Sequence, residues 1–156
     1  MESKKEIRLD EKVMIKSIAP WTTGSPRKTT SGDISIPPNG SILVSREEII
    51  AQSQNGNKLI NGIDGLGSHA TWYIEDEYCR NELSFESGAK KQDCLTLDKI
   101  KDAFELKTMK AFKDRIEKHV ITRAEKAYLM SSIKTLGLNE WDKNAFCVEY
   151  TGMQIE

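Results

Sequence analysis

The chain has 156 residues, and its 23 basic and 24 acidic side chains leave a formal net charge of -1. A chain of this length buries roughly two thirds of its unfolded surface, so it can form one medium domain or two small ones. The balanced charge excludes a strong overall field that would attract nucleic acid or an anionic membrane. The charged stretch Met1–Lys5 lacks the apolar core of a signal peptide, so we expect a soluble product that is not exported.

The first elements expected from the sequence are an arm, a strand and a loop. Residues 1–10 are mostly charged and should form a loose arm. The residues from Val13 to Ile18 alternate with the period of two that is typical of a strand, which ends at Ala19–Pro20. Glycine, serine, threonine and proline dominate the stretch Trp21–Gly32, so an exposed loop is expected there.

A hairpin and a short helix are expected next. Asp33–Ile36 and Ser41–Val44 have strand composition, and the Pro-Pro-Asn-Gly turn between them predicts that they pair as a hairpin. Ser45 and Glu48 have the spacing of a capping box, which would open a short helix that ends near Asn55–Gly56.

A glycine-rich loop follows this helix. Residues 61–68 contain Gly62, Gly65 and Gly67 and lead into Ala70–Glu75, which is rich in aromatic and branched side chains and should be a strand. A weaker strand is expected through Leu83 and Phe85. The polar stretch 87–94 has the composition of a linker.

Four helices are expected in the remaining residues. Leu97, Ile100 and Phe104 share one helical face, but the apolar spacing resumes out of phase at Met109, so Thr108 should cap a second helix. Separate start and stop signals bound the third and fourth helices: a capping box at Thr122 and Glu125, a stop at Gly137, a cap at Asn139 and a stop at Gly152.

The expected fold class is therefore α+β. A small β-rich N-terminal module with one short helix precedes a compact module of about four short α-helices. The hydrophobic period changes from two to 3.6 across the polar stretch, which favours a division there. The predicted units are an arm (1–10), a β-rich module (11–86), a linker (87–94) and a helical module (95–156).

Limited proteolysis tests this division. We expect cleavage within Ser87–Asp93, because that stretch is polar and contains glycine, and release of a C-terminal fragment that contains Leu95–Glu156 and folds alone. Circular dichroism of the isolated fragment measures its helicity. A fragment that stays unfolded would mean that the two modules share one core.

No catalytic, cofactor or metal site is predicted. The glycine-rich loop leads into a strand, whereas phosphate-binding loops open a helix. Asp64, Ser68 and His69 are close in sequence and could be drawn as a hydrolase site, but a turn aspartate and a packed histidine are the simpler interpretation. The three cysteines are widely separated, which favours reduced thiols over a disulfide or zinc.

Two features leave a binding role open. The second helix carries Lys107, Lys110 and Lys113, which could contact nucleic acid, although lysines on the wet face of an amphipathic helix are the usual case. Trp141 and Tyr150 either pack in the core or anchor an interface.

A family resemblance supplies the functional expectation. The segment Gly-Ile-Asp-Gly-Leu-Gly-Ser-His-Ala before Tyr-Ile-Glu-Asp resembles small proteins of tailed bacteriophages, including crAss-like phages of gut Bacteroidales. The second half resembles the same proteins at several places: Leu95–Lys99, Lys107–Thr108 with Phe112, Thr122–Lys126 and Glu149–Gly152. The resemblance covers most of the chain beyond residue 30 and implies association with the virion.

The resemblance implies a non-enzymatic structural protein that binds the capsid or neck in multiple copies, located in the virion and, before assembly, in the host cytoplasm. The alternative is an early phage factor that binds a host protein or nucleic acid. Neither a membrane nor a cofactor is expected. Since irregular loops of this length are usually functional, the candidate partner contacts lie mainly in the loops of the β-rich module: Trp21, Asp64, Gly65, Gly67, His69, Trp141 and Tyr150.

Overall fold

The computed structural model describes residues 7–86, 92 and 94–155, and the described chain is mixed α+β, as expected from the sequence. Five strands lie in the N-terminal part: β1 (Lys12–Ser17), β2 (Thr23–Pro26), β3 (Asp33–Ile36), β4 (Ser41–Ser45) and β5 (Trp72–Ile74). Three short helices accompany them: α1 (Arg46–Gln54), α2 (Lys58–Asn61) and α3 (Glu77–Glu82). Four further helices follow: α4 (Leu97–Phe104), α5 (Met109–His119), α6 (Arg123–Thr135) and α7 (Trp141–Thr151).

The strands form two antiparallel sheets rather than the expected hairpin. One sheet has the order β4-β1-β5, and the other pairs β2 with β3. The prediction that Asp33–Ile36 pairs with Ser41–Val44 is therefore wrong. The turn between them does form, with Asn39 at φ 51°, but Asn39 N–H donates to the carbonyl of Ala19 at 2.8 Å, and the chain passes from one sheet to the other. The expected exposed loop Trp21–Gly32 also contains a strand, β2.

One apolar cluster, which we call the β core, lies between the two sheets and α1. It contains Ile15, Ile34, Val44 and Trp72, all at most 1 % exposed. Trp72 Nε1 donates to Thr23 Oγ1 at 2.7 Å, so the N–H of this buried ring has a hydrogen-bond acceptor. The bond joins β5 of one sheet to β2 of the other.

The N-terminal part has three helices where one was expected. Asp76 caps α3, because its side chain accepts from the backbone N–H of Cys79 at 3.1 Å. This helix replaces the weak strand that the sequence suggested through Leu83 and Phe85, and that prediction is wrong. Phe85 follows the helix and is fully buried in the β core.

Glu48 departs from the expected capping box. Ser45 does cap α1 by accepting from Glu48 N–H at 3.3 Å, but the Glu48 carboxylate turns to the loop between β2 and β3. There it accepts from Lys28 N–H at 2.9 Å, Thr29 N–H at 3.0 Å and Thr29 Oγ1 at 2.8 Å, and Gln52 Nε2 donates to it at 2.8 Å. The carboxylate, only 1 % exposed, thus fixes the loop onto α1.

The four predicted C-terminal helices are confirmed. The side chain of Thr108 accepts from Ala111 N–H, and Thr122 with Glu125 forms a complete capping box. Gly137 ends α6 at φ 64°, and Leu138 N–H returns to the carbonyl of Ile133 at 3.0 Å, as a Schellman motif requires. The expected cap at Asn139 is wrong by one residue, because α7 has Glu140 in the cap position without a side-chain hydrogen bond.

Lys143, on α7, forms hydrogen bonds that join this helix to the end of α4. It is 8 % exposed, and its ammonium group donates to the carbonyls of Phe104 and Leu106, the latter at 2.9 Å. Glu140 lies 2.9 Å away as its ionic partner. A cation on α7 therefore satisfies carbonyls at the C-terminus of α4.

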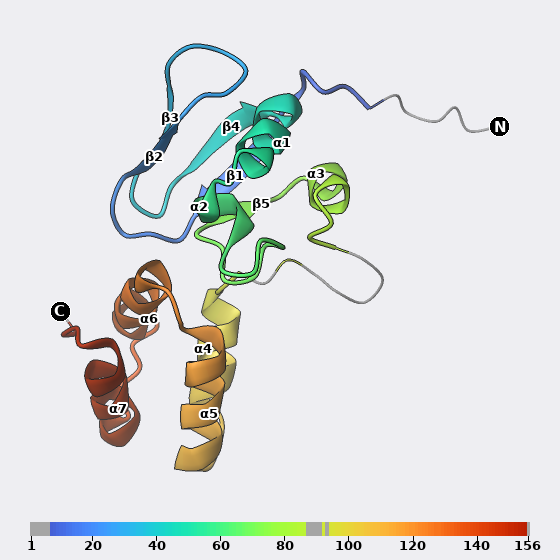
Figure 1. The fold of residues 1–156 in the computed structure, drawn as a ribbon. Helices are drawn as coiled ribbons and strands as arrows, with labels where there is room; N and C mark the ends of the chain where they lie inside the picture. Colours follow the sequence, from blue (N-terminus) through green and yellow to red (C-terminus); the bar gives the residue numbers. More distant parts are fainter. Residues whose placement is uncertain (1–6, 87–91, 93, 156) are drawn as a thin grey trace.

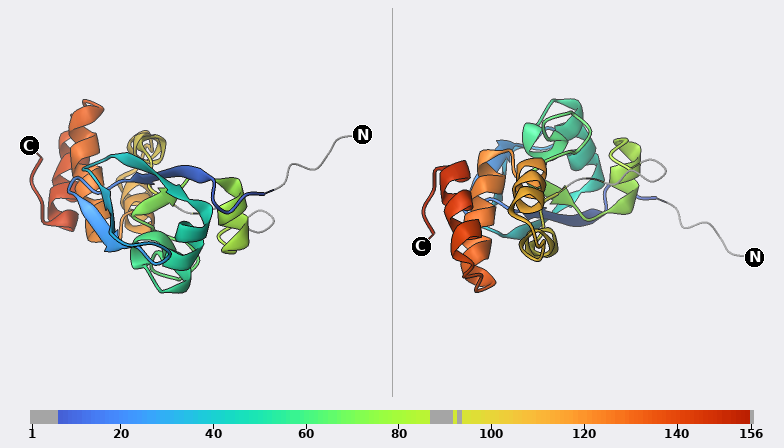
Figure 2. Two further views of the ribbon diagram at one scale, coloured as in Figure 1. Left: turned by 90° about the horizontal axis from the view of Figure 1, so that it is seen from above. Right: turned by 90° about the horizontal axis from the view of Figure 1, so that it is seen from below.

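The helices enclose a second cluster, the helical core, which includes Ile100, Phe112, Ile116 and Leu129 and also takes in Ile18 from the end of β1. Figure 1 shows α4–α7 gathered on one side of the strands. In both views of Figure 2, α6 and α7 lie at one end of the molecule and α3 at the other. Most of the predicted linker lies outside the described residues, so the module boundary stays a prediction.

Candidate functional site

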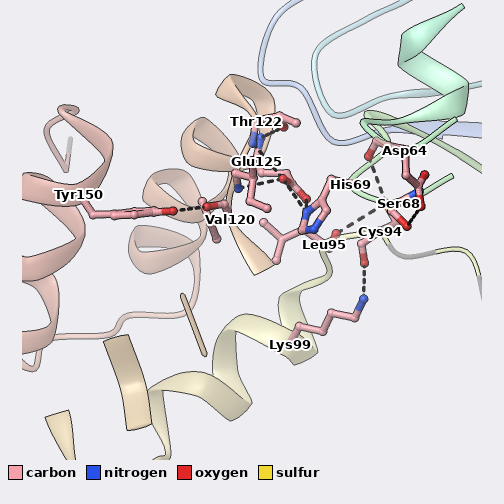
Figure 3. A network of polar contacts seen from close by, with 12 residues as sticks. Asp64, Ser68, His69, Cys94, Leu95, Lys99, Val120, Thr122, Glu125 and Tyr150 are labelled. Carbon is pink, nitrogen blue, oxygen red and sulfur yellow. Dashed lines mark hydrogen bonds and ion pairs between the residues drawn. The ribbon is translucent and has the colours of Figure 1, made fainter. Parts of the chain in front are cut away.

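The glycine-rich loop, residues 61–68, is a closed structure held by its own polar groups. Asp64 Oδ1 accepts from Leu66 N–H at 2.7 Å and from Ser68 N–H at 3.1 Å. Ser68 Oγ donates to Asp64 Oδ2 at 2.6 Å (Figure 3). Asp64 therefore organises a turn, as such side chains commonly do.

Close packing at the base of the loop explains two of its glycines. At Gly62, a Cβ would collide with the carbonyl oxygen of Ser68, and at Gly67 it would lie 2.9 Å from the Phe85 ring. Both residues also have positive φ, which side chains other than glycine rarely adopt. The loop is thereby pressed onto the β core, while Gly65 lies exposed at its tip with φ 76°.

The loop presents two aliphatic side chains to solvent. Ile63 is 58 % exposed and Leu66 is 43 % exposed. A backbone fixed by internal hydrogen bonds loses little entropy when such side chains are covered by a partner. We name Ile63 and Leu66 the loop pair. Sequence reasoning singled out the polar and glycine positions and missed them, although two aliphatic residues among three glycines were a visible signal.

His69 joins this loop to the helical part. Its backbone is left-handed, at φ 58°, and its Nδ1 lies 2.9 Å from Glu125 Oε2. Glu125 is 1 % exposed and also accepts from the N–H groups of Ile121 and Thr122, each at 3.0 Å. Figure 3 shows His69 between the loop and the start of α6. Because its side chain is only 11 % exposed, His69 positions the loop rather than facing solvent.

A hollow of about 480 Å³ lies beside this junction. Exposed Ile63 forms one wall, and Thr122, at the start of α6, forms another. The full lining consists of Asn57, Lys58, Leu59, Gly62, Ile63, His69, Thr71 and Thr122. One member of the loop pair, Ile63, thus lines a concave surface.

Trp21, which precedes β2, also contacts the start of α6. The guanidinium carbon of Arg123 lies 5.4 Å from the centre of the Trp21 ring, a cation–π distance. Trp21 remains 37 % exposed. Five of the seven predicted contacts therefore lie on the loop or at the start of α6: Trp21, Asp64, Gly65, Gly67 and His69.

The two aromatic candidates on α7 lie elsewhere. Tyr150 donates its hydroxyl to the carbonyl of Val120 at 2.7 Å and stacks on Phe146 with ring centres 5.6 Å apart. Burial, with the nearby negative charge of Glu117, raises the pKa of Tyr150. Figure 3 places Tyr150 across α6 from the loop, so it ties α7 to the bundle. Trp141, in contrast, is 79 % exposed at the start of α7.

Cys79, Cys94 and Cys147 are buried thiols that are not joined in disulfide bonds. Burial raises the pKa of Cys79 and of Cys147 to about 12 each, so neither thiol is activated at neutral pH. Within the part of the chain that the structure describes, no group of three or more His, Cys, Asp or Glu side chains is placed to hold a metal ion. Across those same residues, no helix has the length and apolar character needed to cross a membrane.

Comparison of the chain with protein-family models, curated proteins and solved structures gave no match.

Proposed function

We propose that the protein is a non-enzymatic structural component of a tailed phage, bound to the capsid or neck of the virion through the loop pair and the adjoining hollow. The proposal rests on one observation: two exposed aliphatic side chains, Ile63 and Leu66, belong to a loop whose backbone is fixed by hydrogen bonds. Soluble proteins expose single apolar residues commonly, but Ile63 and Leu66 are two exposed aliphatic residues of one short loop whose backbone is held by the Asp64 turn.

The surroundings of the loop pair support a protein partner. The hollow beside it offers room for a side chain from that partner, and its lining is mostly apolar or neutral, with Lys58 and His69 as its titratable groups. The His69–Glu125 contact holds the loop against α6, so both walls of the hollow keep their spacing before a partner arrives. Such preorganisation reduces the entropy lost on binding.

Incorporation into particles tests this proposal. In the variant Ile63→Ser with Leu66→Ser, both side chains are exposed, so stability should change by no more than about 0.5 kcal/mol per site. Its amount in purified particles should fall at least about tenfold, which corresponds to about 1.4 kcal/mol of lost contact. Quantitative mass spectrometry of particles from a complemented phage deletion measures this ratio.

The matched control is Leu9→Ser, because Leu9 is 45 % exposed and its carbonyl accepts from Glu47 N–H at the start of α1, not from the loop. Its incorporation should equal that of the natural protein. Equal incorporation of the loop-pair variant would reject the proposed contact. If the natural protein itself were absent from particles and abundant soon after infection, the alternative of an early factor that binds a host protein or nucleic acid would be favoured.

A further inference from the structure

Strand β4 is an open edge of the three-stranded sheet. Among the described residues, the order β4-β1-β5 leaves one side of β4 and one side of β5 without a neighbouring strand. On the β5 side, Arg80 Nη1 donates to the carbonyl of Ile74 at 2.8 Å, and α2 and α3 pack against the strand. For β4, the main contacts among the described elements are with β1 and α1.

The hydrogen-bond pattern shows which residues of β4 face away from β1. Ser17 N–H donates to the carbonyl of Gly40 at 2.8 Å, and the backbone N–H of Arg46 donates to the backbone carbonyl of Glu11 at 3.0 Å, at the two ends of the β1–β4 ladder. Bonding alternates from residue to residue in an antiparallel pair, so the even-numbered residues of β4 bond to β1. The peptide groups of Ser41 and Leu43 and the N–H of Ser45 therefore point to the open side, while the Ser45 carbonyl belongs to α1, which Ser45 caps.

This edge lacks the usual protection against pairing. Natural edge strands are commonly blocked by charged side chains, proline or a bulge. The segment Ser41–Ser45 has the sequence Ser-Ile-Leu-Val-Ser, without charge or proline, and its register with β1 is regular throughout. Its central side chain, Leu43, is 55 % exposed.

We propose that β4 pairs antiparallel with β4 of a second copy of this chain, about a two-fold axis at Leu43. The outward-facing residues are symmetric about that position, so Leu43 meets Leu43 of the second copy and Ser41 meets Ser45. Facing leucines place apolar side chains together on one side of the strands, and the inward residues Ile42 and Val44 also meet. No like charges face each other, which makes this strand complementary to itself.

This pairing joins the two three-stranded sheets into one continuous sheet. A single strand pair buries less than the roughly 1,200 Å² of a typical stable interface, so the dimer forms at high protein concentration, as on an assembly surface. The inference uses a surface separate from the loop pair and holds whether or not the protein binds a virion.

Charge reversal at the axis tests the pairing. Sedimentation velocity of the purified full chain, from about 10 µM to about 1 mM, should show a monomer–dimer equilibrium. Leu43→Lys and Leu43→Glu should each be monomeric at all concentrations, because like charges then face each other across the axis. An equimolar mixture of the two should regain dimer, since the facing charges become opposite.

The matched control is Ile121→Lys, which introduces the same charge at another exposed aliphatic residue, 43 % exposed between α5 and α6, and it should dimerise like the natural chain. Circular dichroism should show unchanged melting for both Leu43 variants, because that side chain lies on the surface. A natural chain that stays monomeric at the highest concentration would overturn the proposal. So would dimerisation of Leu43→Lys alone, or a mixture of the two variants that stays monomeric.

Discussion

Replacing Glu48 by glutamine is expected to lower the free energy of unfolding at neutral pH by about 3 kcal/mol. The carboxylate accepts hydrogen bonds from Lys28, Thr29 and Gln52 in a site that is 1 % exposed. A glutamine amide turns one acceptor oxygen into a donor, which then faces other donors. Urea denaturation of the natural and variant chains at pH 7 measures the loss.

The same carboxylate predicts a loss of stability in acid. Burial alone would raise the pKa of Glu48, but hydrogen bonds from Thr29, Lys28 and Gln52 together outweigh burial and hold this pKa below its ordinary value of 4.5. A carboxyl group whose pKa is lower in the folded state stabilises the fold fully above its unfolded pKa. That contribution falls as the pH drops below about 4.5 and through the folded pKa.

Glu47→Gln is the matched control, since Glu47 is the preceding residue on α1 and is exposed. Its stability should stay within about 0.5 kcal/mol of the natural chain. The difference between the natural chain and Glu48→Gln should shrink between pH 7 and pH 3. A difference that is independent of pH would show that the charge of Glu48 does not contribute.

Replacing Glu125 by alanine should also lower the free energy of unfolding by about 3 kcal/mol. The change removes the acceptor for Ile121 and Thr122 at the start of α6 and for His69 on the glycine-rich loop. Urea denaturation measures the total, and Glu149→Ala, at an exposed position on α7, is the control.

A double-mutant cycle separates the His69 contact from the helix cap. His69→Asn suits the cycle because asparagine tolerates the left-handed backbone found at this position. The two single changes should be coupled by about 1–2 kcal/mol, since each removes the same contact. Strictly additive effects would mean that His69 contributes nothing through Glu125.

The sequence predicted the helical part well because its signals are local. Thr108 and the Thr122–Glu125 pair each lie within one helical turn of the amides that they cap. Gly137 likewise marks a helix end through its own backbone conformation. The spacing of a few residues was sufficient to place these boundaries.

Strand pairing was predicted poorly because it depends on contacts distant in sequence. Alternation indicated strands at Asp33–Ile36 and Ser41–Val44, but it cannot say that the first pairs with β2 and the second with β1. The Ser45–Glu48 spacing predicted the cap of α1 correctly but not the role of the Glu48 carboxylate, which binds a loop about twenty residues earlier in the chain.

The candidate site was predicted in part. The glycine-rich loop was chosen correctly as a shaped loop, and the interpretation of Asp64 as a turn residue agrees with its hydrogen bonds. The sequence shows Ile63 and Leu66 as aliphatic residues among the glycines, but their degree of exposure depends on which loop residues pack against Phe85. The burial of His69 likewise depends on α6, which begins more than fifty residues later.

The Lys143 contact has a consequence for folding during synthesis on the ribosome. The carbonyls of Phe104 and Leu106 accept hydrogen bonds from Lys143, a residue that is translated almost forty residues later. While the earlier helices leave the exit tunnel, the end of α4 can be satisfied only by water, so its last turn frays. We expect the end of α4 to gain its full protection from hydrogen exchange only once α7 has packed against it, whatever the helix propensity of α4 itself.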